Sequence, residues 1–169
     1  MRLRTLFIMK IFNASPGFSD PLTEDEIVSF LVNQTHNIHL GTIDEKKHPN
    51  IHPTWYYYDP NKNKIYVETA KNSKKVQNIS NNQTIYFCID DPKPPYKGVR
   101  GKGKTAISQS LDFNLMISKK IMIKYLGSLD NAMAKILLEN VEHGNSVILE
   151  ITPLYFSTWD YGKNKKNLT

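Results

Sequence analysis

The chain has 169 residues, enough for one domain with a sizeable hydrophobic core and too few for two domains of ordinary size. Hydrophobic residues make up 40% of the chain and charged residues 22%, which excludes a wholly disordered protein. The formal net charge of +6 favours an anionic partner, such as a phosphorylated cofactor, a nucleic acid or a membrane surface.

Cys88 is the single cysteine, so neither an intramolecular disulfide nor a cysteine-based metal cluster is expected. It lies in the apolar run 85–89, where we expect a buried, inert thiol, and both observations favour the reducing cytoplasm. The five histidines have no metal-ligand spacing, so no metal site is expected. No apolar stretch approaches the ~20 residues that cross a bilayer, and no membrane partner is expected.

The two ends of the chain differ in composition from the part between them. Residues 1–19 carry Gly, Pro and Ser and are predicted to be a disordered or loose N-terminal arm. Lys10 interrupts the first apolar stretch too early for a signal peptide, and whether translation starts at Met1 or Met9 stays open. Residues 163–169 are predicted to be a frayed tail, which leaves residues 20–162 as a single domain.

The predicted elements follow one another with short connections. A capping box, Thr23 to Glu26, begins an amphipathic helix, and Ser73 is expected to cap a second, short one. Two further helices, 111–125 and 131–141, form an αα-hairpin. Strands are expected at residues 37–43, 51–58, 64–69, 83–89, 97–108, 146–151 and 154–159, the last two separated by Pro153.

This order predicts a mainly β (α+β) protein: a split β-barrel of about six to eight antiparallel strands with peripheral helices. Closure of the sheet removes exposed strand edges, which favours a barrel over an open sheet. A parallel α/β sheet is disfavoured because the first strands are joined too tightly for crossover helices.

The segment from Thr69 to Lys75 leaves a strand and enters a helix, and it carries the strongest local signal for binding. Amides at a helix N-terminus and two hydroxyls, those of Thr69 and Ser73, can donate hydrogen bonds to a phosphate. Lys74 and Lys75 add positive charge. An ordinary capped helix with solvated lysines is the alternative.

Four pieces of sequence, in this order and spacing, resemble the pyridoxamine 5'-phosphate oxidase-related FMN-binding split β-barrel family, including its deazaflavin-dependent reductase branch. They are Leu40-Gly41-Thr42-Ile43, Pro49-Asn50-Ile51-His52-Pro53-Thr54-Trp55, Ile65-Tyr66-Val67-Glu68-Thr69 and Ser73-Lys74-Lys75-Val76-Gln77-Asn78-Ile79. The resemblance covers residues 37–108 well, and the strand that ends at Trp159 less specifically.

The resemblance implies a homodimer with its cofactor sites at the subunit interface. It places residues 52–55 along the isoalloxazine ring and ribityl chain, and four residues after them around the phosphate. Arg100 and Trp159 would approach the cofactor, either from the same subunit or from the partner subunit. The implied cofactor-binding residues are His52, Pro53, Thr54, Trp55, Thr69, Ser73, Lys74, Lys75, Arg100 and Trp159.

The activity that the resemblance implies is a flavin-dependent oxidoreductase that transfers a hydride to or from an unidentified small molecule. Lys74 stands where the family usually has arginine. The lysine keeps the positive charge but cannot donate the two parallel hydrogen bonds of a guanidinium group. No basic set for a substrate phosphate is found near the C-terminus, so vitamin B6 oxidation is not expected. No side chain stands out as a catalytic acid or base.

Two alternatives to FMN chemistry stay open. Arg100, Lys102 and Lys104 share one face of a strand, which is either a charge-protected edge or a groove for the anionic tail of a deazaflavin coenzyme. A non-catalytic flavin- or haem-binding module would also explain the missing acid and base. Nucleic acid is not expected as a partner, because aromatic and basic residues are not interleaved as they are in known binding modules.

Overall fold

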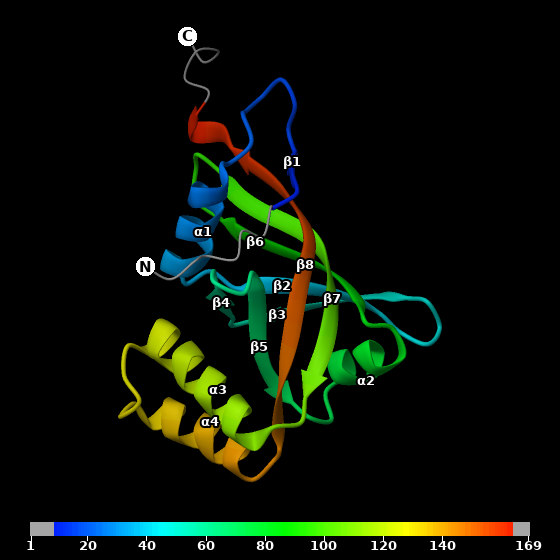
Figure 1. Cartoon of the computed structure of the whole chain (residues 1–169), viewed down its shortest axis with the longest axis vertical. Helices are drawn as coiled ribbons and strands as arrows, with labels where there is room; N and C mark the ends of the chain where they lie inside the picture. Colours follow the sequence, from blue (N-terminus) through cyan, green and yellow to red (C-terminus); the bar gives the residue numbers. More distant parts are fainter. Residues whose placement is uncertain (1–8, 164–169) are drawn as a thin grey trace.

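The computed structural model describes residues 9–163, in which eight strands form one curled sheet (Figure 1). The strands are β1 (Ile11–Asn13), β2 (Ile38–Ile43), β3 (Pro49–Thr54), β4 (Tyr57–Asp59), β5 (Lys64–Ala70), β6 (Thr84–Asp91), β7 (Lys97–Ser108) and β8 (Ser146–Asp160). Seven of them follow the order β3-β2-β6-β7-β8-β5-β4, in which all neighbours are antiparallel, and β1 pairs with β8 outside this order. The predicted split barrel is confirmed.

Four helices lie around the sheet: α1 (Glu24–Asn33), α2 (Lys74–Asn81), α3 (Leu111–Leu126) and α4 (Ala132–Glu142), with a short 3-10 turn, η1 (Tyr161–Lys163), after β8. The predicted capping box is present, since the Glu26 amide donates to Thr23 Oγ1 and the Thr23 amide to Glu26 Oε2. The α3–α4 hairpin covers the lower end of the sheet in Figure 1, on the side away from α2. No helix within residues 9–163 is long and apolar enough to cross a membrane.

Residues 146–160, expected as two strands, form the single long strand β8. Pro153 does not interrupt it because the strand bulges there: the register passes from Lys102↔Tyr155 to Gly103↔Pro153 and leaves Leu154 without a partner on β7. A bulge is a position at which a strand tolerates a residue without a backbone N–H.

The stretch 51–58, expected as one strand, divides into β3 and β4. The two parts pair with different neighbours, β2 and β5, so the chain crosses the split of the barrel at residues 55–56. This crossing places residues 53–55 beside the end of β5, where they line one cleft together with residues 68–70.

Part of the predicted loose N-terminal arm lies against the sheet. Residues 11–13 form β1, which runs parallel to β8 and pairs Ile11 with Phe156. The amide of Ala14 continues the contact by donating to the Thr158 carbonyl (2.9 Å). This strand was not predicted, because a three-residue edge strand carries too little alternation to detect. Residues 1–8 and the predicted tail from residue 164 lie outside the described part of the chain.

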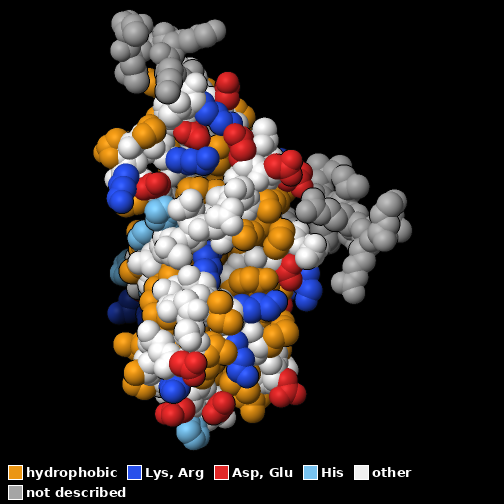
Figure 2. Space-filling view, turned by 90° about the vertical axis from the view of Figure 1, so that its left-hand side faces the viewer, with side chains coloured by type: hydrophobic (Ala, Val, Ile, Leu, Met, Phe, Trp, Pro, Cys, Tyr) orange, Lys and Arg blue, Asp and Glu red, His pale blue; other side chains and the backbone are white. Residues whose placement is uncertain are grey.

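The interior consists of two hydrophobic clusters on opposite faces of β5 and β8. The larger fills the barrel and receives the buried side of α1, including Ile27 and Leu31. The smaller joins the sheet to the hairpin through Tyr66 and Ile148, which face α3 and α4. Figure 2 shows Lys and Arg side chains spread among hydrophobic ones on the side that carries α1 and the hairpin, with no single basic patch.

Gly101 on β7 allows β7, β8 and β6 to approach closely. A Cβ atom there would overlap the Tyr155 carbonyl oxygen and the Phe87 ring. We expect Gly101→Ala to lower the free energy of unfolding by about 1–3 kcal/mol, measured by urea denaturation. Gly41→Ala on β2 is the control, because its Cβ would meet only ordinary contacts at 3.5 Å or more. Equal stability of the two variants would contradict this packing.

Candidate functional site

The corner between the end of β5 and the start of α2 brings together three of the predicted phosphate-binding residues. The Lys75 ammonium donates a hydrogen bond to Thr69 Oγ1 (2.9 Å), and Thr69 Oγ1 lies 3.2 Å from Ser73 Oγ. Thr69 is buried with its side chain toward the barrel, whereas Ser73 and Lys75 are partly exposed. One ammonium and two hydroxyls therefore converge where the strand passes into the helix.

A second polar group lies beside this corner and includes the predicted residue His52. His52 Nε2 is 3.1 Å from Thr42 Oγ1, and Asn78 Nδ2 donates to the same oxygen (2.9 Å). Thr42 and Asn78 are almost completely buried, which fixes the His52 ring against β2 and α2. We refer to His52, Thr69, Ser73 and Lys75 together as the phosphate corner.

The electrostatics of the phosphate corner are those of a cation without a counter-ion. Burial lowers the pKa of Lys75, and no carboxylate within residues 9–163 forms an ion pair with it. The pKa of His52 is also lowered, first by burial and then by the Lys75 charge, so the imidazole is neutral at pH 7. An anion bound here would stabilise the Lys75 charge.

The N-terminus of α2 is open toward this corner. Ser73 occupies the N-cap position, as predicted, but its side chain makes no capping hydrogen bond and contacts Thr69 instead. The amides of the first helical turn consequently have neither an intrahelical acceptor nor a side-chain cap. Lys74, the fourth predicted phosphate ligand, is exposed. The pKa of Asp44, on the loop between β2 and β3, is lowered first by a hydrogen bond from the His48 amide, and the Lys74 charge adds to this shift.

Three further predicted residues, Pro53, Thr54 and Trp55, line a cleft of about 530 Å³ between the sheet and the α3–α4 hairpin. Thr69 lines the cleft as well, so it joins the phosphate corner to this space. The Trp55 ring stacks on Tyr125 of α3 at 4.9 Å between centroids and 8° between planes. We refer to this space as the hairpin cleft.

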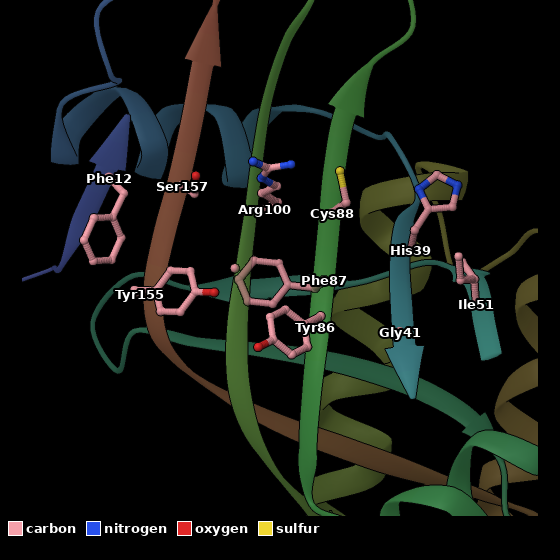
Figure 3. Close-up of a pocket in the computed structure, with 11 residues that line it drawn as sticks. Phe12, His39, Gly41, Ile51, Tyr86, Phe87, Cys88, Arg100, Tyr155 and Ser157 are labelled. Carbon is pink, nitrogen blue, oxygen red and sulfur yellow. The ribbon is translucent and has the colours of Figure 1, made fainter. Parts of the chain in front are cut away.

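Arg100 and Trp159 lie elsewhere, on the outer face of the sheet. Figure 3 shows Arg100 among side chains from β1, β2, β3, β6 and β8. These side chains line a hollow of about 750 Å³. Trp159 covers Gly98 at the end of the same face. These two residues are therefore not brought to the phosphate corner of their own subunit.

The outer face also carries Cys88 and the predicted basic stripe. The Cys88 thiol is only partly buried, unlike the expectation, because it points into the hollow with Arg100. Burial and the nearby Asp90 raise its pKa to about 11, so the thiol stays protonated and unreactive at pH 7. Arg100, Lys102 and Lys104 alternate along β7 on this face, as the sequence predicts.

Comparison with known proteins agrees with the split-barrel fold. A model of the pyridoxamine 5'-phosphate oxidase family matches residues 23–160. The chain belongs to this family. No curated protein matched the chain when the sequences were compared.

Solved structures of the same fold include three informative relatives. The conserved hypothetical protein Rv2991 of Mycobacterium tuberculosis has 20% identity and a TM-score of 0.74, with 89% of this chain and 92% of that chain covered. An F420 reductase has 20% identity and a TM-score of 0.60, covering 76% and 94%. HutZ, a haem storage protein of Vibrio cholerae, has 11% identity and a TM-score of 0.61, covering 81% and 93%. These likenesses establish the split-barrel fold.

Sequence reasoning missed three polar residues of the site region: Thr42, Asn78 and Glu68. Asn78 could have been found, because it lies on the apolar face of α2 with Val76 and Ile79, where a buried amide needs a partner. Thr42 follows the buried residues Ile38 and Leu40 at a spacing of two on β2 and so faces the barrel. Glu68 could not have been found from the sequence, because the cleft that it lines forms only when the α3–α4 hairpin packs against the sheet.

The contact between Lys75 and His52 can be tested by titration. We expect Lys75→Gln to raise the pKa of His52 toward its ordinary value, because the variant removes a nearby positive charge. Histidine Cε1 resonances followed by NMR against pH measure it, and Lys74→Gln is the control. An unchanged His52 pKa in Lys75→Gln would contradict the proximity of the two groups.

Proposed function

We propose that the protein binds FMN and is an oxidoreductase that uses it to transfer a hydride to or from a small molecule. The observation that carries the proposal is the uncompensated Lys75 ammonium beside two hydroxyls and an open helix N-terminus. Family membership supports it, since FMN is the cofactor that the family typically binds.

The residues present fit a phosphate monoester. Lys75 supplies the charge, and the hydroxyls of Thr69 and Ser73 and the first amides of α2 supply directed donors. Neutral His52 can donate or accept one hydrogen bond without adding charge. A dianionic phosphate would therefore meet donors on several sides and a cation whose burial it offsets.

The flavin ring supplies the hydride chemistry when it is bound, and the protein supplies binding and orientation. The phosphate corner fixes one end of the cofactor, while residues 53–55 on the crossing from β3 to β4 give the rest of it an edge to lie against. The Trp55–Tyr125 stack holds that edge rigid against α3.

Removing the Lys75 charge tests the proposal. We expect Lys75→Gln to weaken FMN binding by about 1.5–3 kcal/mol, or roughly 10- to 150-fold in Kd, because one charge-assisted contact is lost. Quenching of flavin fluorescence on titration with protein measures the affinity. Lys71→Gln, an exposed lysine four residues away with the same change in charge, is expected to bind FMN normally. Equal loss in both variants, or in neither, would contradict the proposed phosphate corner.

A deazaflavin coenzyme is the second candidate cofactor. Arg100, Lys102 and Lys104 form a basic stripe along β7 that suits a long anionic tail, and the F420 reductase shares the fold. A haem-binding role has a relative in HutZ but no such feature in its favour. The absorbance maximum of the cofactor that copurifies with the protein distinguishes the three.

The outer face supports a further part of the proposal, a homodimer. Phe12, Ile51 and Tyr86 expose 44%, 72% and 54% of their surface around the hollow of Figure 3, and apolar surface of this kind favours a protein partner. A second copy that covers this face would bring the Arg100 and Trp159 of each subunit to the interface, as the family resemblance implies.

We expect Ile51→Glu to convert the dimer to a monomer, because it places a charge at the most exposed of the three apolar side chains of this surface. Sedimentation equilibrium at several protein concentrations measures the mass. Ile136→Glu, at an exposed position on the outside of α4, is the matched control and should leave the dimer intact. A monomeric wild-type protein, or a dimer that only Ile136→Glu separates, would contradict this interface.

A further inference from the structure

The hairpin cleft contains one charged side chain among the described residues that line it, the carboxylate of Glu68. Glu68 lies on β5 opposite Ile148 of β8, on the sheet face that packs against α3 and α4. Its neighbours on that face, Tyr66 and Ile148, are buried and apolar, so a hydrophobic residue would suit packing at this position.

Glu68 makes no ion pair in the described part of the chain. No Lys, Arg or His within residues 9–163 forms an ion pair with it, whereas Glu150, two pairs farther along the same face, is paired with Lys64 at 3.1 Å. Burial raises the pKa of the Glu68 carboxyl, and a hydrogen bond with the Ser146 side chain opposes the shift only in part. Partial burial of a carboxylate without an ionic partner is unfavourable, and packing against neighbouring side chains does not offset this free energy.

The rest of the lining has a mixed character suited to a small organic molecule. Trp55, Ile121, Met122 and Leu137 give an apolar wall, and a second set of residues gives amides. These are Asn37, Asn140 and Asn145. The volume of about 530 Å³ has room for a molecule of one or two rings.

We infer that the hairpin cleft binds a small organic cation, an amine with an apolar body, whose ammonium group is held by the Glu68 carboxylate. The apolar wall takes the body of the ligand, and the asparagine amides offer further hydrogen bonds. The Glu68 carboxylate repels carboxylate and phosphate groups at its own end of the cleft, although the protein as a whole is positive. The claim that this cation is the substrate of the enzyme rests on the proposed function. The claim that the cleft binds a cation rests on the cleft alone.

Two probes of the same shape and opposite charge test the inference: phenethylamine and 3-phenylpropionate. The methyl resonances of Ile121 and Met122, which line the cleft, report binding by NMR. At pH 7.5 we expect phenethylamine to shift both methyl signals and to bind at least about tenfold more tightly than 3-phenylpropionate. This comparison uses the wild-type protein and needs no variant.

Glu68→Gln, which keeps the size of the side chain, is expected to weaken phenethylamine binding about tenfold and to remove the preference for the amine. Glu150→Gln, which removes a carboxylate on the same face outside the cleft, is the control and should bind the amine normally. The inference is overturned if the anion binds as well as the amine, if Glu68→Gln binds the amine unchanged, or if millimolar amine shifts neither methyl signal.

The same titration in Lys75→Gln separates this inference from the proposed function. Amine binding that survives in Lys75→Gln while FMN binding is lost places the two ligands in different subsites. If the wild-type protein binds the amine but does not bind FMN, the cation site is supported and the FMN proposal is wrong. If it binds FMN but does not bind the amine, the FMN proposal is supported and the cation site is wrong.

Discussion

The Lys75 ammonium is half buried where β5 ends and α2 begins, and within the described chain no carboxylate pairs with it. Burying a cation in this way costs free energy that a single hydrogen bond to Thr69 does not restore. Packing of the same helix offsets this unfavourable free energy, because Val76 and Ile79 on its other face lie in the barrel core. The proposed function depends on this one unbalanced charge and on the anion that would balance it.

Two charges of opposite sign, neither of which has an ionic partner among the described residues, lie on either side of Thr69. Lys75 faces the phosphate corner, and Glu68, the residue before Thr69, faces the hairpin cleft because alternate side chains of a strand point to opposite faces. The end of β5 thereby offers an anion site and a cation site to separate groups. A cofactor phosphate and an amine substrate could be held at neighbouring places by consecutive residues of one strand.

The helical hairpin makes this arrangement possible. Without α3 and α4 the face of β5 that bears Tyr66 and Glu68 would be open to water, and the Glu68 carboxylate would be an ordinary solvated charge. The hairpin is attached at several points: Tyr125 stacks on Trp55, and Lys124 donates to the Leu31 carbonyl at the end of α1 (2.8 Å). Burial lowers the pKa of Lys124 to about 8, so this tie is weakened when the ammonium loses its proton above that pH.

Local patterns predicted the elements well and the contacts between them poorly. The Thr23 capping box, the hairpin and strand 97–108 could be read from spacing alone, because each is specified by neighbours in sequence. The β8 bulge at Pro153 and the short strand β1 could not, because partners far along the chain determine them. The same holds for the site: Ser73, Lys75 and Thr69 form a local motif, whereas the cleft around Glu68 exists only after the hairpin has packed.

A crystal structure of the protein grown with FMN is the most direct test of the central claim. We expect the FMN phosphate to lie within hydrogen-bond distance of Lys75 Nζ, Thr69 Oγ1 and the first amides of α2. A flavin bound with its phosphate elsewhere, or a Lys75 side chain turned into solvent beside an empty corner, would contradict it.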